Sequence, residues 1–300
     1  MQATATPISP FGSRIRSLTA GLAMSALSMA SVSALAAGYE KGPDPTVASL
    51  EASGPFVTAS SKLPNASDYG NGTTVFYPTD RKSGSFGLVV LCPGFVSPAS
   101  LYSGIAQRIA SHGFVVAVVS TKSLVDQPKA RGDQIIAVMK AVIAQNKVQA
   151  VAYAGQVDDS RVAIGGHSAG GSGTFYAAVS QPQLKALVGL MPGEPGTNFA
   201  PFAGIRIPTL LLTGSIDALA NSWAHPYFAQ LDPTLPAAHI DLAGIGHLSL
   251  WTTATQASQG KIAKYVTAWV KRFVDEDTRY TPFVKTAASD MSMANFHGDY

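Results

Sequence analysis

The five residues Gly166-His167-Ser168-Ala169-Gly170 place one hydroxyl group between two glycines at the spacing G-x-S-x-G. This spacing is typical of a sharp, strained turn from a strand into a helix, where a Cβ at either glycine would collide with neighbouring backbone. Such a turn exposes the serine hydroxyl as a nucleophile for acyl transfer. A glycine-rich turn capped by serine would fit the same letters without chemistry, but the apolar run before the motif and the helical pattern after it favour a nucleophile. We therefore predict that Ser168 attacks a carbonyl carbon.

A serine hydroxyl needs a general base to remove its proton, and after a turn of this kind the base is a histidine that follows an acid further down the chain. Three downstream histidines qualify, namely His225, His239 and His247. His239 lies inside the apolar run AAHIDLAG and is expected to be a strand residue, while His225 precedes a proline and is expected on a helix face or in a turn. His247 follows that apolar run in a glycine-bearing loop that can reach the serine. We predict His247 as the base.

The acid of such a site orients the second ring nitrogen of the histidine and stabilises the imidazolium. Asp217 lies just past the apolar run PTLLLTGS and ahead of the predicted base. Asp241 is a rival, but it falls within a predicted strand, and Glu194 follows the wrong strand for the usual arrangement. Three acids that precede the serine are expected to be turn or capping residues: Asp126, Asp158 and Asp159. We predict Asp217 as the acid.

Two backbone N–H groups should stabilise the negative charge that develops on the attacked oxygen. One is expected from Ala169, directly after the nucleophile, and the other from Phe95, in the loop after the apolar run LVVLCPG. Cys92 ends that run. We expect its thiol to act as a small buried apolar group rather than as a reactive one.

The framework that must position these groups alternates apolar runs with helical patterns. Six runs without polar alternation predict buried strands: 84–94, 114–121, 161–166, 185–192, 208–215 and 237–244. Two earlier strands are predicted at 55–63 and 72–80, and helices at 98–113, 133–146 and 261–277. Buried strands separated by helices predict a mostly parallel sheet covered on both faces. No repeat and no change of composition follows residue 40, so we expect a single α/β domain.

The first 36 residues differ from the rest. Arg14 and Arg16 precede a small, uncharged apolar run that ends in Ala34-Leu35-Ala36. A basic start, an apolar middle and a small-residue cleavage site predict a secretory signal peptide, cleaved after Ala36 or Ala37. A membrane anchor is the alternative, but about 20 strongly apolar residues would be needed to span a bilayer, and Ser, Thr and Gly interrupt this run. We expect a secreted or periplasmic protein with its catalytic domain at 37–300.

Composition excludes several other classes of protein. Cleavage of the signal peptide would remove two arginines and no acidic residue, so the formal net charge falls from +3 to +1, without the basic excess of nucleic-acid-binding proteins. No later segment is apolar enough to cross a bilayer. The six histidines lack the paired spacing of zinc ligands, and neither an HExxH motif nor a calcium loop is present. One cysteine excludes an intramolecular disulfide. We expect a monomer without metal or cofactor.

Five stretches together resemble the secreted bacterial cutinase-like polyester hydrolases, which include the poly(ethylene terephthalate) hydrolases: GPDPTVASLEASGPF, VFYPTD, SHGFVVAVVST, GHSAGG and VKRFVDEDTRY. They are spread over nearly the whole predicted mature chain. The resemblance implies an α/β-hydrolase fold and cleavage of carboxylic esters in polyesters through an acyl-enzyme, without a cofactor. It also implies a triad of Ser168, Asp217 and His247, with Phe95 and Ala169 forming the oxyanion hole.

The resemblance further implies a substrate subsite formed by Phe95, Gly193 and Leu219. The family usually has a tryptophan that stacks on the substrate ring where this chain has Gly193, and a methionine where it has Ala169. We therefore expect a cleft with one aromatic and one aliphatic wall but without its main aromatic clamp. An esterase or lipase acting on soluble or lipid esters is the alternative function. A non-catalytic binding protein on a hydrolase fold is a more distant one.

Overall fold

A computed structural model describes residues 39–193 and 198–300, apart from the side chains of 219–222. The predicted signal peptide and the rival acid Glu194 lie outside the described residues. Nine strands of the described chain form one sheet. They are β1 (Thr58–Lys62), β2 (Thr74–Pro78), β3 (Phe86–Cys92), β4 (Phe114–Val118), β5 (Val157–His167), β6 (Ala186–Leu190), β7 (Thr209–Gly214), β8 (Ala237–Leu242) and β9 (Met291–His297).

The strand order is β1-β2-β4-β3-β5-β6-β7-β8-β9. The six central strands, from β4 to β8, are parallel to one another, whereas the β1–β2, β2–β4 and β8–β9 pairs are antiparallel. The chain passes from β3 outward to β4 and then returns to β5 on the other side of β3. At the carboxyl ends of β3 and β5, the two following loops therefore run in opposite directions along the sheet. In open α/β sheets such a switch of direction is where ligands bind.

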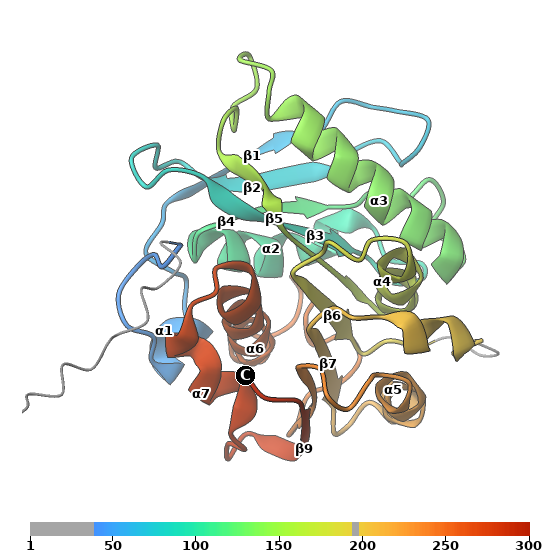
Figure 1. Ribbon diagram of the computed structural model, residues 1–300. Helices are drawn as coiled ribbons and strands as arrows, with labels where there is room; N and C mark the ends of the chain where they lie inside the picture. The colour runs from blue at the N-terminus through green and yellow to red at the C-terminus, as the bar shows by residue number, and fades with distance from the viewer. Residues whose placement is uncertain (1–38, 194–197) are drawn as a thin grey trace, which may run out of the picture. The chain divides into compact units, whose positions relative to one another are not determined.

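Helices cover both faces of the sheet (Figure 1). The α-helices of the described chain are α1 (Val47–Glu51), α2 (Ser103–Ser111), α3 (Pro128–Gln145), α4 (Ala169–Val179), α5 (Ala218–Ala229), α6 (Gln256–Val274) and α7 (Thr281–Lys285), and short 3₁₀ turns are η1 (Ala99–Tyr102), η2 (Ala200–Gly204) and η3 (Thr278–Tyr280). Leu50, Ile109 and Trp269 place α1, α2 and α6 in the core on one face. Ile135 and Phe175 place α3 and α4 in the core on the other face, together with α5.

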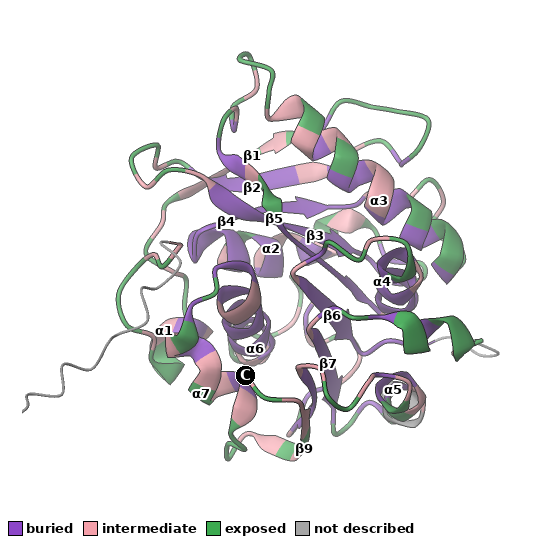
Figure 2. Ribbon diagram, viewed as in Figure 1, coloured by how far each residue is buried: buried purple, intermediate pink, exposed green. Residues whose placement is uncertain are grey.

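Five of the central strands, β3, β4, β6, β7 and β8, are buried along their whole length because both of their faces carry helices (Figure 2), whereas β5 is buried from Arg161 to His167 but not at residues 158–160. All seven residues of β3 and all five of β4 are buried, and accordingly neither strand alternates apolar with polar residues. This matches the sequence pattern from which buried parallel strands were predicted. The architecture is that of a single α/β-hydrolase domain with a mostly parallel sheet, as expected.

Most of the predicted elements are confirmed, with shifted boundaries, but the helices α1, α5 and α7 and the last strand were not predicted. Helix α3 begins at Pro128 and α6 at Gln256, each five residues before the predicted start. The first turn of α3 is set by a proline at N1, which is compatible with a helix only at its beginning. Strand β9 was not predicted, because its half-exposed residues lack a clear apolar pattern. Its stability comes from pairing with the edge of β8.

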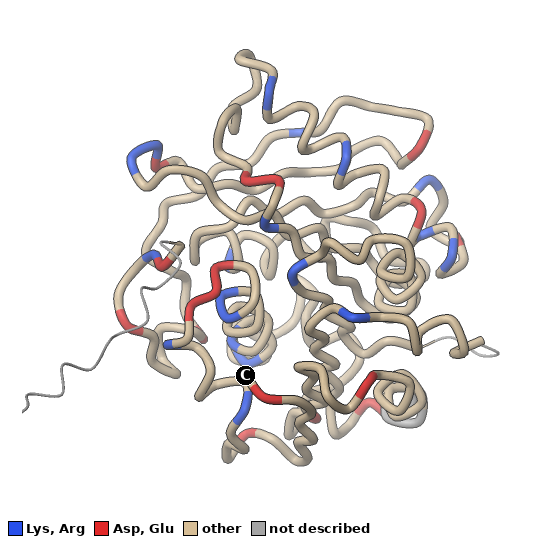
Figure 3. The backbone as a smooth tube through the Cα atoms, in the orientation of Figure 1, with Lys and Arg blue, Asp and Glu red and all other residues tan. Residues whose placement is uncertain are grey.

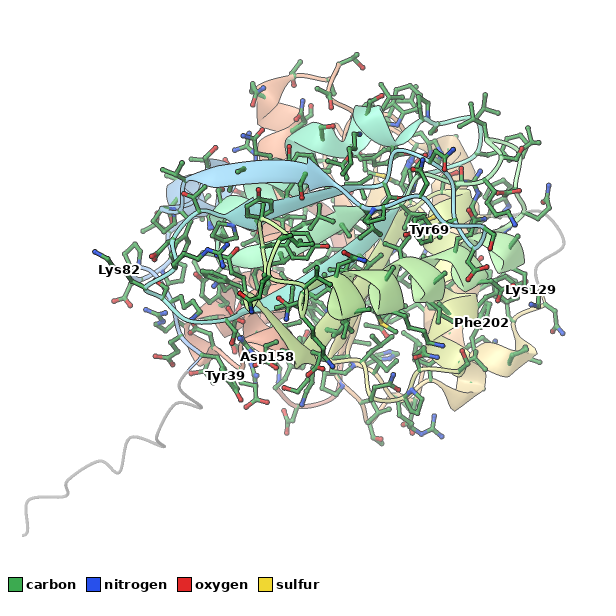
Figure 4. All side chains as sticks on the ribbon, turned by 90° about the horizontal axis from the view of Figure 1, so that it is seen from above. Tyr39, Tyr69, Lys82, Lys129, Asp158 and Phe202 are labelled. Carbon is green, nitrogen blue, oxygen red and sulfur yellow. The ribbon has the colours of Figure 1, made fainter. Side chains whose placement is uncertain are left out.

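A buried cluster of charges ties helix α6 to strand β5. Arg161 binds both Asp158, at 2.8 Å, and Asp275, at 2.7 Å, and Asp275 also binds Lys271 at 2.7 Å. The side chains of Arg161, Asp275 and Lys271 are at most 3% exposed. The guanidinium of Arg161 also lies 4.1 Å from the ring centre of Tyr39. Tyr39 and Asp158 are labelled in Figure 4. This cluster anchors the first described residues against the sheet.

The remaining charges are interspersed over the backbone rather than gathered in one basic run (Figure 3). Among the helices within 39–193 and 198–300, none combines the length and apolarity needed to cross a bilayer. In the same ranges no cluster of three or more His, Cys, Asp or Glu side chains is arranged to hold a metal ion.

Candidate active site

Ser168 stands between the end of β5 and the start of α4 in a backbone conformation that non-glycine residues rarely adopt. Its φ is 53° and its ψ is −123°. Two backbone hydrogen bonds hold it there: its N–H donates to the Leu190 carbonyl at 2.9 Å, and its carbonyl accepts from the Ser172 N–H at 2.9 Å. Strain of this kind costs about 1–3 kcal/mol and occurs at functional sites that need a side chain presented at a fixed angle. The predicted sharp turn is present, and its hydroxyl-bearing residue is half-buried.

The two glycines of the motif are required by close backbone contacts. A Cβ at Gly166 would lie 2.3 Å from the Gly170 carbonyl oxygen. A Cβ at Gly170 would lie 2.3 Å from the carbonyl oxygen of Pro93 and 2.4 Å from that of Cys92. All three distances are far inside van der Waals contact, so neither position has room for a side chain. The second contact also brings the end of β3 against the first turn of α4.

His247 and Asp217 are paired directly. The Nδ1–H of His247 donates a hydrogen bond of 2.6 Å to Oδ2 of Asp217, whose side chain is only 2% exposed. Asp217 follows β7 and precedes α5, while His247 follows β8, so the carboxyl ends of two neighbouring strands bring the pair together. Because a carboxylate only accepts, Nδ1 carries the proton and Nε2 is left available as a base. The imidazole is 25% exposed, which gives it access to a substrate.

The rival residues have other contacts. Asp241 accepts hydrogen bonds from the hydroxyls of Thr213 and Ser292, which fix its carboxylate between β7 and β9. His239 is fully buried in β8 with its Nε2 3.2 Å from the Thr213 hydroxyl. His225 lies exposed on α5. These positions agree with the strand and helix-face locations expected for the two histidines.

The loop after β3 lies against the nucleophile. A Cβ at Gly94 would come within 3.0 Å of Cβ of Ser168. The next residue, Phe95, is the predicted oxyanion donor, and Ala169 begins α4. Within the described residues neither Phe95 nor Ala169 has an acceptor for its backbone N–H. The positive end of the α4 dipole adds to the potential at this point. The backbone of Gly94 and the N-terminus of α4 therefore lie beside Ser168.

His167 precedes the nucleophile, is 1% exposed, and has contacts that no motif predicts. Its Nε2 lies 2.9 Å from the backbone carbonyl of His247, and its Nδ1 lies 2.8 Å from the hydroxyl of Tyr102. That hydroxyl also accepts from the Gly94 N–H at 2.9 Å and from the indole N–H of Trp251 at 3.3 Å. These contacts could not be read from the sequence, because the partners are 8 to 149 residues apart.

Gly193 lies beside the site, and a tryptophan occupies the space that its side chain would need. Pro192, the residue before Gly193, packs on the first turn of α4: its Cα would be 3.1 Å from a Cβ built at Gly171. A Cβ at Gly193 would lie only 1.8 Å from Cε3 of Trp223, on α5. The expectation of a cleft without a second aromatic group must therefore be revised, because Trp223 packs on Gly193. The side chain of Leu219, also on α5, lies outside the described residues.

Cys92 is buried at the end of β3 and forms no disulfide. Burial raises the pKa of its thiol to about 12, so the nucleophilic thiolate is scarce at neutral pH. This agrees with the expected role as a small apolar group.

Comparison with known proteins leads to the same family as the sequence motifs. A family model described as PET hydrolase-like matches residues 33–299. The chain is 36% identical to a cutinase of Thermobifida fusca (strain YX) over 91% of this chain and 88% of that protein. It is 37% identical to cutinase 1 of Thermobifida cellulosilytica, over 82% and 90% of the two chains. It is also 36% identical to the bis(hydroxyethyl) terephthalate hydrolase of Streptomyces coelicolor (strain ATCC BAA-471 / A3(2) / M145), over 82% and 76%. The chain therefore belongs to the PET hydrolase-like family of carboxylic ester hydrolases.

Proposed function

We propose that the protein is a secreted serine hydrolase that cleaves the carboxylic ester bonds of polyesters through an acyl-enzyme. The observation that carries this proposal is the pairing of Asp217 with His247 at the same sheet edge as the strained Ser168. A buried carboxylate, an imidazole with a free Nε2 and a serine on a sharp turn are the three parts of an acyl-transfer site. Membership of a family of ester hydrolases supports the same chemistry.

In the first half of the reaction, Oγ of Ser168 attacks the ester carbonyl carbon while Nε2 of His247 takes the hydroxyl proton. The carbonyl oxygen becomes an oxyanion, which accepts hydrogen bonds from the N–H groups of Phe95 and Ala169. Collapse of this intermediate breaks the bond to the alcohol oxygen, which leaves with the proton from His247. The acyl group remains on Ser168 as an ester.

In the second half, water attacks the acyl carbon and gives a proton to Nε2 of His247. A second oxyanion forms in the same place and collapses, which releases the carboxylic acid and returns the proton to Ser168. Asp217 keeps the imidazole oriented and stabilises its positive charge in both halves. No metal or cofactor takes part in any of these steps.

The surface around the site supports a large apolar substrate. Of the ten large apolar side chains that are exposed in the described ranges, six lie on loops at the carboxyl ends of the parallel strands. They are Phe95 and Val96 after β3, Leu124 and Val125 after β4, Ile216 after β7 and Leu248 after β8. An exposed apolar rim around a site favours an insoluble or polymeric substrate over a small soluble ester.

Phe95, Gly193 and Leu219 remain the proposed substrate-binding residues, and Trp223 joins them. Because Trp223 is partly exposed and packs against Gly193 beside the first turn of α4, it supplies an aromatic wall from a different helix. An aromatic acyl group can stack on such a wall. The substrate class we favour is therefore a polyester with aromatic units.

Two assays test this function. Hydrolysis of a short p-nitrophenyl ester separates an enzyme from a binding protein, since a non-catalytic protein would release no nitrophenol. Product analysis on amorphous poly(ethylene terephthalate) film and on an emulsified triglyceride separates a polyester hydrolase from a lipase. Soluble terephthalate esters released from the film, at a rate exceeding that of fatty acid release, would support the proposal. Fatty acid release alone would favour the lipase alternative.

We also propose that residues 1–36 direct export and that the mature chain acts as a monomer. The basic start and the Ala34-Leu35-Ala36 cleavage site support export. N-terminal sequencing of protein recovered outside the cytoplasm should begin at Ala37 or Gly38, and light scattering should give the mass of one chain. Retention of Met1 in the exported protein would contradict cleavage of the signal peptide. A mass of two chains would contradict the monomer.

A further inference from the structure

His167 contacts both of the loops that carry the catalytic groups. One ring nitrogen lies 2.9 Å from the carbonyl of His247, and the other lies 2.8 Å from the hydroxyl of Tyr102, which binds the N–H of Gly94 at 2.9 Å. Gly94 precedes Phe95, the proposed oxyanion donor. The chain of contacts therefore runs from the base loop, through the residue next to the nucleophile, to the oxyanion loop.

Only one proton arrangement satisfies all of these contacts. The His247 carbonyl can only accept, so Nε2 of His167 must carry a hydrogen. In a neutral imidazole Nδ1 is then an acceptor, so the Tyr102 hydroxyl donates to it. The lone pairs of that hydroxyl remain for the N–H groups of Gly94 and Trp251. Each donor has an acceptor, and the direction of every bond follows from the first.

The neutral state that this arrangement needs is maintained by burial. The ring of His167 is 1% exposed, and burial, with His247 nearby as a second cause, lowers the pKa of His167 to about 3. The ring centres of His167 and His247 are 4.6 Å apart at 48°. Two adjacent imidazoles therefore have different tasks, since one keeps a fixed tautomer and the other exchanges its proton during the reaction.

We propose that His167 is a positioning residue, which couples the backbone of the catalytic base to the backbone of the oxyanion loop through its two ring nitrogens and Tyr102. The proposal rests on the proposed function, because it assigns what is held in place. Its effect is on geometry: a displacement of about 1 Å at a reacting group can cost on the order of 10²-fold in rate. Substrate affinity depends on the cleft walls instead, so the loss should fall on kcat.

Two amide variants of the full mature chain separate the two arms. The amide nitrogen of Gln in His167→Gln can reach the place of Nε2 and donate to the His247 carbonyl. Asn in His167→Asn reaches only the place of Nδ1, where it can accept from Tyr102 but not reach His247. Both replace the ring by an amide and differ by one methylene. With p-nitrophenyl acetate, we expect His167→Asn to lower kcat about 10²-fold and His167→Gln to recover at least tenfold of that loss, with KM changed less than threefold in both.

Tyr102→Phe tests the other arm, because it removes the hydroxyl while keeping the ring. The Gly94 N–H then loses its acceptor, so the backbone at Gly94 and Phe95 should be displaced from its position beside Ser168. Phenylboronic acid reports this, since its tetrahedral adduct with a serine places an oxygen in the oxyanion hole. We expect its Kd to rise about tenfold or more, whereas the Kd of benzoate, which forms no tetrahedral adduct, should stay within twofold. This arm also decides the matter if the two His167 variants do not fold.

The outcomes separate failure of this proposal from failure of the proposed function. Ser168→Ala is the reference: if it retains activity, the proposed function is wrong. If Ser168→Ala is inactive but His167→Asn and His167→Gln have equal kcat values, or if Tyr102→Phe binds phenylboronic acid as tightly as the parent, His167 does not act as proposed. A loss confined to the midpoint of thermal unfolding, with kcat unchanged, would likewise make the network purely structural.

Discussion

The indole of Trp223 lies so close to the backbone of Gly193 that a Cβ there would be 1.8 Å from Cε3. Helix α5 thus places a ring over a residue that the strand-end loop leaves without a side chain. Two residues thirty positions apart in sequence have to be considered as one wall of the cleft.

This relationship changes the outcome expected for the cleft. From the sequence, Gly193→Trp would add a missing aromatic clamp, but a side chain at 193 must first displace Trp223. We therefore expect Gly193→Trp alone to slow all large substrates, and Gly193→Trp combined with Trp223→Ala to recover turnover of aromatic polyester oligomers. Parallel rates on bis(hydroxyethyl) terephthalate and on an aliphatic diester of similar size measure this. Faster aromatic turnover by the single variant would contradict the packing argument.

Trp223 itself should set the preference for aromatic acyl groups. Stacking of aromatic groups contributes roughly 0.5–1.5 kcal/mol beyond burial. Trp223→Ala should therefore lower the ratio of aromatic to aliphatic turnover about 2- to 10-fold, while p-nitrophenyl acetate changes little. Trp223→Phe is the matched control, because it keeps a ring and should keep most of the ratio. An unchanged ratio in Trp223→Ala would exclude the ring from the substrate site.

Removal of the nucleophile should abolish ester hydrolysis. Ser168→Ala is expected to lower kcat on the order of 10⁶-fold, and Asp217→Asn by roughly 10⁴-fold because the imidazole loses its tautomer and orientation. Single-turnover kinetics with p-nitrophenyl acetate measures both. Ser180→Ala is the matched control, because Ser180 is an exposed serine at the end of the same helix. Activity of Ser168→Ala within tenfold of the parent would rule Ser168 out.

The close contacts of Gly170 predict that a side chain there destabilises the protein, whereas a side chain at Gly204, which has no such contacts, should not. Gly170→Ala would press a Cβ against the carbonyl oxygens of Pro93 and Cys92, so the free energy of unfolding should fall by about 1–3 kcal/mol or more. Gly204→Ala is the matched control, since no atom lies within 4 Å of a Cβ there, and it should change by less than about 0.5 kcal/mol. Urea denaturation checks both. Equal values for the two variants would refute the contact argument.

Three buried histidines should make the protein sensitive to mild acid. Burial lowers the pKa of His167 to about 3 and those of His112 and His239 to about 4, against about 6.5 in an unfolded chain. Between about pH 6.5 and pH 4 the unfolded chain binds protons that the folded protein excludes. Stability is therefore fully present above the unfolded pKa and falls on acidification, with a slope of up to about 1.4 kcal/mol per pH unit for each histidine.

Urea denaturation at several values between pH 7 and pH 4.5 measures this slope. His239→Gln should reduce it by up to about 1.4 kcal/mol per pH unit, because one of the three histidines is gone. The contacts of His239 are with Thr213, His225 and Phe228, so the catalytic pair is not touched directly. A free energy of unfolding that is constant from pH 7 to pH 5 would contradict the prediction.

Several features were determined by the sequence alone because they depend on local chemistry. The alternation of apolar runs with helical patterns predicted the order of strands and helices, since a strand with both faces covered needs apolar residues throughout. The spacing around Ser168 predicted the sharp turn, because only glycine tolerates the backbone contacts at 166 and 170. The positions of Asp217 and His247 after two apolar runs predicted which acid and which histidine would meet, since parallel strands end at one sheet edge.

Other features were decided only by the tertiary structure, because they depend on contacts between distant segments. The pairing of β9 with β8 has no apolar signature and comes from an available sheet edge. The contacts of His167 join it to Tyr102, 65 residues away, and to the His247 loop, 80 residues away, and a histidine in a turn gives no sign of such partners. Likewise, the sequence showed that Gly193 has no side chain, but only the packing of α5 placed the ring of Trp223 where that side chain would be.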